Sequence, residues 1–289
     1  MTNISTATSH DTDHLLRPDE IEAYRRDGYL VPRFRLTGDD LTLLQGLIGQ
    51  LVEDNPDRLD KAMVSPHIPG GGVQNLKVKG GWLPISTHPR IVDIVSQLIG
   101  PDVILWGSTV FYKRAAKGPM TAWHRDGQAW PIRPLATTTV WIAASPSTRE
   151  NGCLRVIPGS HAGRQLGRHV YEDRPDMMVR LSLDPSEVDE DKAVDVELQA
   201  GEMVIFDVYT IHGARHNFGT IPRAGYALRF MPATSHFDHD GAFNRNEPGY
   251  AHETRGLILV RGVDACGRND FQRGHPGASQ NRAPAQGSA

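Results

Sequence analysis

Residues 122–163 read AWHRDGQAWPIRPLATTTVWIAASPSTRENGCLRVIPGSHAG. The segment contains short runs rich in Val, Ile and Thr, such as LATTTVWIAAS and CLRVIPGS, which are separated by Pro, Gly and Asn. β-Branched residues favour strands, and the three separating residue types favour turns. The segment therefore predicts short strands joined by turns. It also places a histidine and an aspartate one residue apart, between two tryptophans.

The strand pattern extends on both sides of this segment, from residue 102 onward. Further strand-like runs are DVILWGSTVFYKR, VDVELQ, EMVIFDVYTIHG and GYALRFMP. LQAGEMVIFD also predicts a β-hairpin that turns at Ala200-Gly201. The first third of the chain is instead helical, because apolar residues recur at helical spacing between Pro and Gly signals in 16–33, 37–56 and 88–101. Helices followed by at least six short strands predict a double-sheet or barrel fold faced by helices.

Composition narrows the class of protein. The chain has 289 residues, of which 39% are hydrophobic and 22% charged, as in globular proteins. A formal net charge of −3 offers no bulk attraction to nucleic acid or to an anionic membrane. No apolar run approaches the ~20 residues that span a bilayer. The N-terminus lacks the apolar core of a secretory signal, and two distant cysteines form no disulfide framework, so a cytoplasmic location is expected.

Both ends of the chain are polar or rich in Gly, Pro, Ala and Ser, and such segments bury too little apolar surface to fold. We therefore expect disordered tails at 1–15 and 271–289 and a single domain at 16–270.

The HxD pair is the first candidate for a functional site. Alternate residues of a strand point to the same face, so His124 and Asp126 would project together while Arg125 faces away. A third ligand must come from elsewhere, and His212 is the candidate because it ends an apolar strand. Two histidines and one carboxylate on one face of an octahedron leave three open positions, the arrangement of non-haem Fe(II) oxygenases.

Arg223 follows His212 by 11 residues, at the start of the next strand-like run. A guanidinium there could bind one carboxylate of a keto acid whose other end chelates the metal, and 2-oxoglutarate has that shape. Each of these residues taken singly could be structural: His212 a satisfied strand-end histidine, Arg223 a surface arginine. Their combination and order on a β-rich chain indicate a metal site.

The sequence resembles the phytanoyl-CoA dioxygenase family of Fe(II)/2-oxoglutarate oxygenases, in particular its ectoine-hydroxylase-like bacterial branch. The quoted segment, HGARHNFGTIPR at 212–223 and LRPDEIEAYRRDGYLVPR at 16–33 all fall in the family's order. The resemblance implies a double-stranded β-helix, or jelly roll, that is mainly β with flanking helices. It implies that His124, Asp126 and His212 bind Fe(II) and that Arg223 binds 2-oxoglutarate. It further implies hydroxylation of an unactivated C–H with dioxygen, releasing succinate and CO₂, without other catalytic residues.

Two departures from the family pattern concern the co-substrate. Many members carry a serine two residues after the second histidine, where this chain has Ala214, and an asparagine near the position of Phe111. We expect a rearranged or water-mediated contact to 2-oxoglutarate, with Arg223 as the anchor. Related halogenases replace the motif carboxylate with a small residue, so Asp126 disfavours halogenation.

The resemblance also nominates residues around the substrate pocket. These substrate-binding candidates are Gln74, Asn75, Lys77, Trp82, Tyr112, Trp130 and Arg229. The substrate is expected to be a free small metabolite. High usage of Gly, Pro and Arg is typical of bacteria with GC-rich genomes. Relatives of this protein in such bacteria often act in natural-product biosynthesis. The oligomeric state stays open, with a homodimer as one option.

Other functions remain open at this point. Desaturation, epoxidation or cyclisation by the same chemistry would differ only in substrate placement. A cupin-type metalloenzyme that does not use 2-oxoglutarate would share the fold but has no use for Arg223. Zinc hydrolysis could use the same three ligands. A non-catalytic binding protein would be expected to have lost at least one of them.

Overall fold

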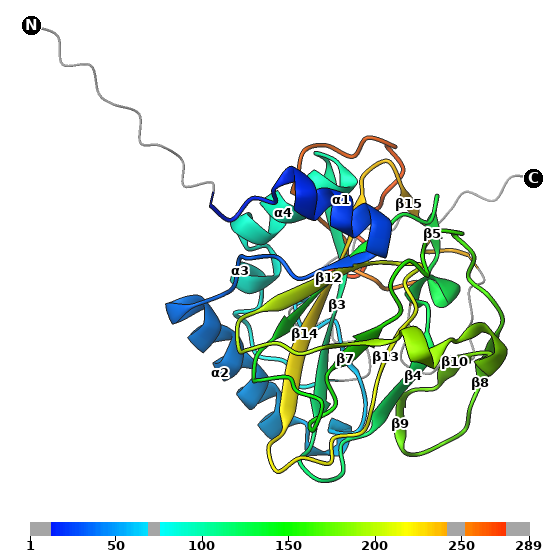
Figure 1. The fold of residues 1–289 in the computed structure, drawn as a ribbon. Helices are drawn as coiled ribbons and strands as arrows, with labels where there is room; N and C mark the ends of the chain where they lie inside the picture. Colours follow the sequence, from blue (N-terminus) through cyan, green and yellow to red (C-terminus); the bar gives the residue numbers. More distant parts are fainter. Residues whose placement is uncertain (1–12, 69–75, 242–251, 276–289) are drawn as a thin grey trace, which may run out of the picture.

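The computed structural model describes residues 13–68, 76–241 and 252–275. Two facing sheets form the body of the molecule, with the helices outside one of them (Figure 1). The larger sheet has the order β1 (Tyr29–Leu30), β12 (Met203–Asp207), β6 (Thr138–Ala143), β14 (Arg223–Pro232), β3 (Val103–Lys113) and β16 (Ile258–Arg261), with β2 (Met63–Val64) on β3. The smaller has the order β11 (Val194–Val196), β7 (Leu154–Val156), β13 (His212–Ala214), β4 (Met120–His124) and β9 (Met177–Val179).

Two short strand pairs complete the β structure: β8 (His169–Tyr171) with β10 (Leu181–Leu183), and β5 (Ile132–Arg133) with β15 (His236–Phe237). Of the pairings in the described residues, β4 with β9 is parallel and the other named ones are antiparallel. Two facing, mostly antiparallel sheets are the predicted jelly roll.

The helices cover the outer face of the larger sheet. They are α1 (Pro18–Asp27), α2 (Gly38–Asp54), α3 (Leu83–Ser86) and α4 (Pro89–Ile99). The three helices predicted from periodicity are confirmed as α1, α2 and α4. Pro18 and Pro89 each stand at the first helical position, and Gly28 ends α1 with φ 78°, a conformation that favours glycine. Short 3₁₀ turns occur at Pro56–Arg58, Asp126–Ala129, Pro185–Glu187 and Glu190–Lys192.

Alternation along β14 separates the two faces of the larger sheet. Ala224, Tyr226, Leu228 and Phe230 pack in the cluster beneath the helices. Arg223, Ala227 and Arg229 point the other way and line a cavity between the sheets. Because successive side chains of a strand alternate, this strand supplies both an apolar core face and two arginines for the interior.

The predicted hairpin in LQAGEMVIFD is wrong. Strand β11 before the turn pairs with β7 in the smaller sheet, whereas β12 after it pairs with β6 and β1 in the larger one. A turn does occur, since the Glu202 N–H donates to Gln199 O and Gly201 has φ 88°. It carries the chain from one sheet to the other. A two-residue turn signal does not distinguish a hairpin from a crossing between sheets.

Some residues near both ends of the described part make contacts just outside the predicted domain 16–270. His14 contacts the Asp93 carboxylate at 2.8 Å, and Phe271 packs against a buried cluster. Ordered contacts therefore include a few residues assigned above to the tails. Residues 1–12 and 276–289 lie outside the described part, so the disordered tails stay a prediction. None of the helices in the described ranges has the length and apolar content to cross a bilayer.

Candidate metal centre

Three side chains converge at the end of β4. His124 is the last residue of β4, and its cross-strand partner on β13 is His212. Asp126 Oδ1 lies 3.6 Å from His124 Nε2 and 3.9 Å from His212 Nε2. One ligand atom from each residue can be chosen so that all lie within 4.8 Å of one another. Among the described residues, His124, Asp126 and His212 form the group of potential ligands that could hold a metal ion.

Asp126 reaches this position differently from the prediction. It does not extend the strand but begins the 3₁₀ turn Asp126–Ala129, directly after Arg125 in extended conformation. Arg125 lines the same cavity, and its guanidinium is held by backbone carbonyls: its Nε donates to Tyr209 O and its Nη1 to Leu166 O. The turn also brings Asp126 Oδ2 within 3.2 Å of the Thr139 hydroxyl on β6. The carboxylate thereby lies between the two sheets.

Hydrogen bonds determine which nitrogen of each imidazole faces the centre. His124 Nδ1 lies 2.8 Å from Ala122 O, and His212 Nδ1 lies 2.9 Å from Thr210 O. A carbonyl oxygen only accepts, so each Nδ1 must carry the proton and donate it. The Nε2 atom of each ring is then the one that faces Asp126 and the centre. Such backbone contacts orient metal-binding histidines.

The electrostatics of the centre also favour a cation. Burial opposes ionisation of Asp126, but interactions with the neighbouring His124, His212 and Arg229 hold its pKa well below the usual range. Burial and the neighbouring His124 lower the pKa of His212 to about 4. At neutral pH the site therefore presents one carboxylate anion and a neutral imidazole, the protonation states in which these groups bind metals.

Two imidazole nitrogens and one carboxylate oxygen, all on one side, fit Fe(II) with open positions on the other. The same donors also suit zinc. The predicted ligand set is thus brought together in space, and the open side faces the cavity between the sheets.

Arg223 lines the same cavity from β14, as the sequence suggested. It is 3% exposed, and its Nε and Nη2 donate to Gly152 O at 3.2 and 2.7 Å. Its guanidinium carbon lies 5.0 Å from the Trp141 ring centroid. In the part of the chain that the structure describes, no carboxylate forms an ion pair with it. A buried, uncompensated guanidinium is costly unless an anion joins it.

Gly225 allows this arrangement, because a Cβ there would lie 1.9 Å from Trp141 Cζ2. The tryptophan ring therefore lies directly over the backbone of β14, next to Arg223.

Both positions that depart from the family pattern, Ala214 and Phe111, line the cavity. Thr121, which the sequence reasoning missed, lies opposite Ala214 in the pairing of β13 with β4 and lines the cavity too. Sequence spacing could not reveal this, because the partnership depends on strand register, which is irregular between His212 and Ala214.

The substrate candidates separate into three groups. Trp130 and Arg229 line the cavity. Gln74 and Asn75 lie outside the described residues. Lys77, Trp82 and Tyr112 do not line the cavity. Tyr112 follows Phe111 in β3 and so points to the opposite face, where it packs in the cluster beneath the helices. Lys77 is exposed, and its backbone pairs with the Asn55 side chain. The sequence-based placement of these three residues at the substrate pocket needs correction.

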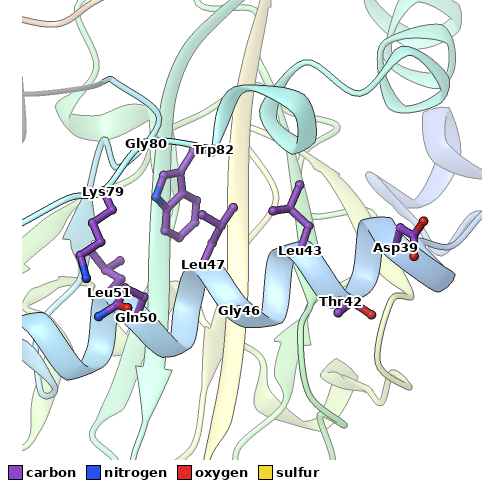
Figure 2. Close-up of a pocket in the computed structure, with 10 residues that line it drawn as sticks. All are labelled: Asp39, Thr42, Leu43, Gly46, Leu47, Gln50, Leu51, Lys79, Gly80 and Trp82. Carbon is purple, nitrogen blue, oxygen red and sulfur yellow. The ribbon is translucent and has the colours of Figure 1, made fainter.

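Trp82 contributes to a different pocket, on the helical side of the molecule. Figure 2 shows its ring over Leu47 of α2, with Lys79 and Gly80 at one end of the groove and Asp39 at the other. Its ring also packs on Tyr226, with centroids 5.1 Å apart. The larger sheet separates Trp82 from the metal centre. Trp82 therefore packs in the core cluster beneath the helices and not at the cavity between the sheets.

Comparison with known proteins agrees with this geometry. Residues 12–225 match the profile of the family described as phytanoyl-CoA dioxygenase (PhyH), well over half of the chain. The chain belongs to this family. Ectoine dioxygenase of Sphingopyxis alaskensis is 23% identical over 248 residues, covering 79% of this chain and 80% of the relative. Peroxisomal phytanoyl-CoA dioxygenase of Bos taurus is 28% identical over 251 residues, covering 81% and 74%.

Solved structures show the same fold. The S. alaskensis enzyme EctD with 2-oxoglutarate and 5-hydroxyectoine has a TM-score of 0.65 at 20% identity, covering 91% of this chain and 90% of the other. The non-heme monooxygenase ThoJ in its apo form has a TM-score of 0.65 at 23% identity, covering 85% of each chain. The family and jelly-roll fold predicted from sequence are confirmed, and with them an enzyme of the dioxygenase class.

Proposed function

We propose that this PhyH-family member is an Fe(II)/2-oxoglutarate-dependent dioxygenase that hydroxylates an unactivated C–H bond of a small metabolite, in natural-product biosynthesis. The observation that carries the proposal is the shared cavity: His124, Asp126 and His212 lie in it together with Arg223, whose charge lacks a carboxylate partner among the described residues. Fe(II) would supply the cation for the three ligands, and a dicarboxylate would supply the anion for Arg223. The relatives named above support this choice.

Each residue then has a defined task. His124 Nε2, Asp126 Oδ1 and His212 Nε2 would hold Fe(II), while Ala122 O, Thr210 O and Thr139 Oγ1 keep the ligands oriented. Bound iron would supply the activation of dioxygen, coupled to conversion of 2-oxoglutarate to succinate and CO₂, that places a hydroxyl on the substrate.

Arg223 would bind the distal carboxylate of 2-oxoglutarate through Nη1, since Nε and Nη2 already donate to Gly152 O. Thr121 would add a hydroxyl at the end where the family carries a serine, because it lies opposite Ala214. Apolar and aromatic side chains such as Leu154 and Trp141 line the same end and limit the water that can enter.

The decisive test needs no substrate. Metal-free protein would receive Fe(II) and 2-oxoglutarate under anaerobic conditions, and the weak visible absorption band of the chelated co-substrate would be recorded. We expect the band with native protein and a much weaker one with Arg223→Ala. Bound iron without a band would favour a cupin-type enzyme that does not use 2-oxoglutarate. Preferential retention of zinc after anaerobic purification would favour hydrolysis instead.

A further inference from the structure

A second buried arginine lines the cavity from the same strand. Arg229 is 9% exposed, and its Nη1 donates to the Thr109 hydroxyl at 2.7 Å. Its guanidinium carbon lies 5.4 Å from the Trp130 ring centroid. Its Nε is buried without a hydrogen-bond partner, and no carboxylate in the described ranges forms an ion pair with it. Among the described residues neither Nε nor Nη2 has a hydrogen-bond partner, so this edge of the guanidinium is not satisfied by the protein.

The charges that face the cavity do not balance. Asp126 is the acidic side chain among the described residues that line it, and the basic ones are Arg125, Arg223 and Arg229. Arg125 lies 3.6 Å from Glu187 and donates to backbone carbonyls, so its charge is compensated. If Fe(II) and the 2-oxoglutarate dianion bind as proposed, Asp126 and Arg223 complete a neutral set. The charge of Arg229 is then left over, in a site where an unpaired charge is costly.

We propose that the substrate carries a carboxylate that pairs with the Nε and Nη2 edge of Arg229 while its carbon skeleton lies against Trp130. This rests on the proposed function and names its substrate class. The free edge of a guanidinium matches the two oxygens of a carboxylate. A single leftover charge suits a monoanion better than a phosphate dianion. Trp130 packs on Trp106, with centroids 4.5 Å apart, so the surface beside the arginine is apolar and rigid.

Arg229 would act on the substrate while Arg223 acts on the co-substrate. Both belong to β14 and are six residues apart, which at about 3.3 Å per residue separates their Cα atoms by roughly 20 Å. Arg229 is the cross-strand partner of Thr139 on β6, whose hydroxyl lies 3.2 Å from Asp126 Oδ2, so Arg229 lies near the metal ligands. A carboxylate held there would place the adjoining carbons near the metal.

The test uses matched probes on the full chain: 3-phenylpropanoate, its uncharged amide and phenyl phosphate. Binding would be measured by Trp fluorescence, with and without Fe(II) and 2-oxoglutarate under anaerobic conditions, and by perturbation of the visible band. For native protein we expect the carboxylate to bind at least about 10-fold more tightly than the amide. Arg229→Gln should abolish this preference, Arg229→Lys should keep part of it, and both should keep the band and bind 2-oxoglutarate within about threefold of native.

Several outcomes would overturn the inference. Equal binding of carboxylate and amide to native protein, or no binding of either at about 10 mM, would remove the anionic requirement. A preference that survives in Arg229→Gln would place the anion elsewhere. Tighter binding of phenyl phosphate than of 3-phenylpropanoate would show that the site prefers a phosphate to a carboxylate. Loss of 2-oxoglutarate affinity in Arg229→Gln as large as in Arg223→Gln would make Arg229 a co-substrate anchor. Absence of the band in native protein would instead count against the proposed function, because fluorescence still reports on the probes. Melting temperatures would show that each variant is folded.

Discussion

Strand β14 places Arg223 and Arg229 at two ends of one cavity, and their surroundings differ. Arg223 donates through Nε and Nη2 to the backbone carbonyl of Gly152, which leaves Nη1 available. Arg229 donates through Nη1 to Thr109, which leaves the Nε and Nη2 edge available. Each guanidinium lies over a tryptophan, Trp141 in one case and Trp130 in the other. The same side chain on one strand can therefore serve two different anions, depending on which edge the fold leaves free.

Loss of a metal ligand should reduce turnover the most, because the co-substrate at the Arg223 end and the substrate at the Arg229 end both react at the metal. We expect Asp126→Ala and His212→Ala to reduce succinate release by at least about 1000-fold, equivalent to about 4 kcal/mol in the activation barrier. His216→Ala is the matched control, since this half-buried histidine lies four residues after His212 and near Asp176 instead. Substantial turnover in both ligand variants would refute the metal assignment.

Exchange of the two arginines for glutamine tests the comparison itself. Loss of one partner of a buried charge pair costs about 2–5 kcal/mol, so Arg223→Gln should raise the 2-oxoglutarate KM at least roughly 30-fold. Arg229→Gln should leave this KM nearly unchanged. Initial rates of succinate release over a range of 2-oxoglutarate concentrations give both values. Similar increases in the two variants would show that the ends are not specialised.

Acid should weaken the structure behind Arg229. His67 contacts the hydroxyl of Ser108, which precedes Thr109, and burial lowers the pKa of His67 to about 3. Between pH 6.5 and 3 the unfolded chain binds a proton at this histidine that the folded chain does not, so stability falls as pH falls through this window. The contribution amounts to about 2 kcal/mol between pH 7 and 5.

Urea unfolding of native protein and of His67→Gln at pH 7 and 5 would measure the difference. The variant should lose less stability on acidification, although other buried histidines such as His169, whose pKa burial lowers to about 4, still contribute. An equal loss in both proteins would show that His67 does not titrate in this way.

Gly225→Ala should disturb the Arg223 end alone. The added methyl group would collide with the Trp141 ring, so the ring must move away from Arg223. We expect about 1–3 kcal/mol of lost stability and weaker 2-oxoglutarate binding, with carboxylate probes still bound at the Arg229 end. Gly46→Ala in α2 is the control, because a Cβ there meets nothing within 4 Å and a helix favours alanine. Thermal melts and 2-oxoglutarate titrations of both variants are sufficient.

The smallest expected effect concerns the hydroxyl at the co-substrate end. Thr121→Val should raise the 2-oxoglutarate KM by roughly 3- to 10-fold, since a hydrogen bond contributes about 0.5–1.5 kcal/mol. The double variant Thr121→Val, Ala214→Ser should recover most of this loss, because residues 121 and 214 are cross-strand partners. An unchanged KM in Thr121→Val would show that the hydroxyl does not face the co-substrate.

Much of the fold follows from local sequence signals. Pro18, Gly28 and Pro89 begin or end helices where they were expected to, because proline fits the first turn and glycine tolerates the left-handed conformation. The hairpin predicted at Ala200-Gly201 failed because a turn signal does not specify which sheet the next strand joins. Tyr112 was placed at the pocket although its neighbour Phe111 is the residue that faces it. The prediction was wrong by one residue, and because side chains alternate along a strand, this shift changes the face to which the side chain points.

The sequence by itself determined the family, the jelly roll, and the candidate metal-binding set of His124, Asp126 and His212, because these residues stand in a recognisable order on a strand-rich chain. Only the tertiary structure decided how they meet. Asp126 arrives on a 3₁₀ turn, and His212 reaches His124 through pairing of strands about 90 residues apart. Strand pairing also decided that Thr121 faces Ala214. Burial decided that Arg223 and Arg229 stand without carboxylate partners among the described residues, because whether a charge is paired depends on its neighbours in space.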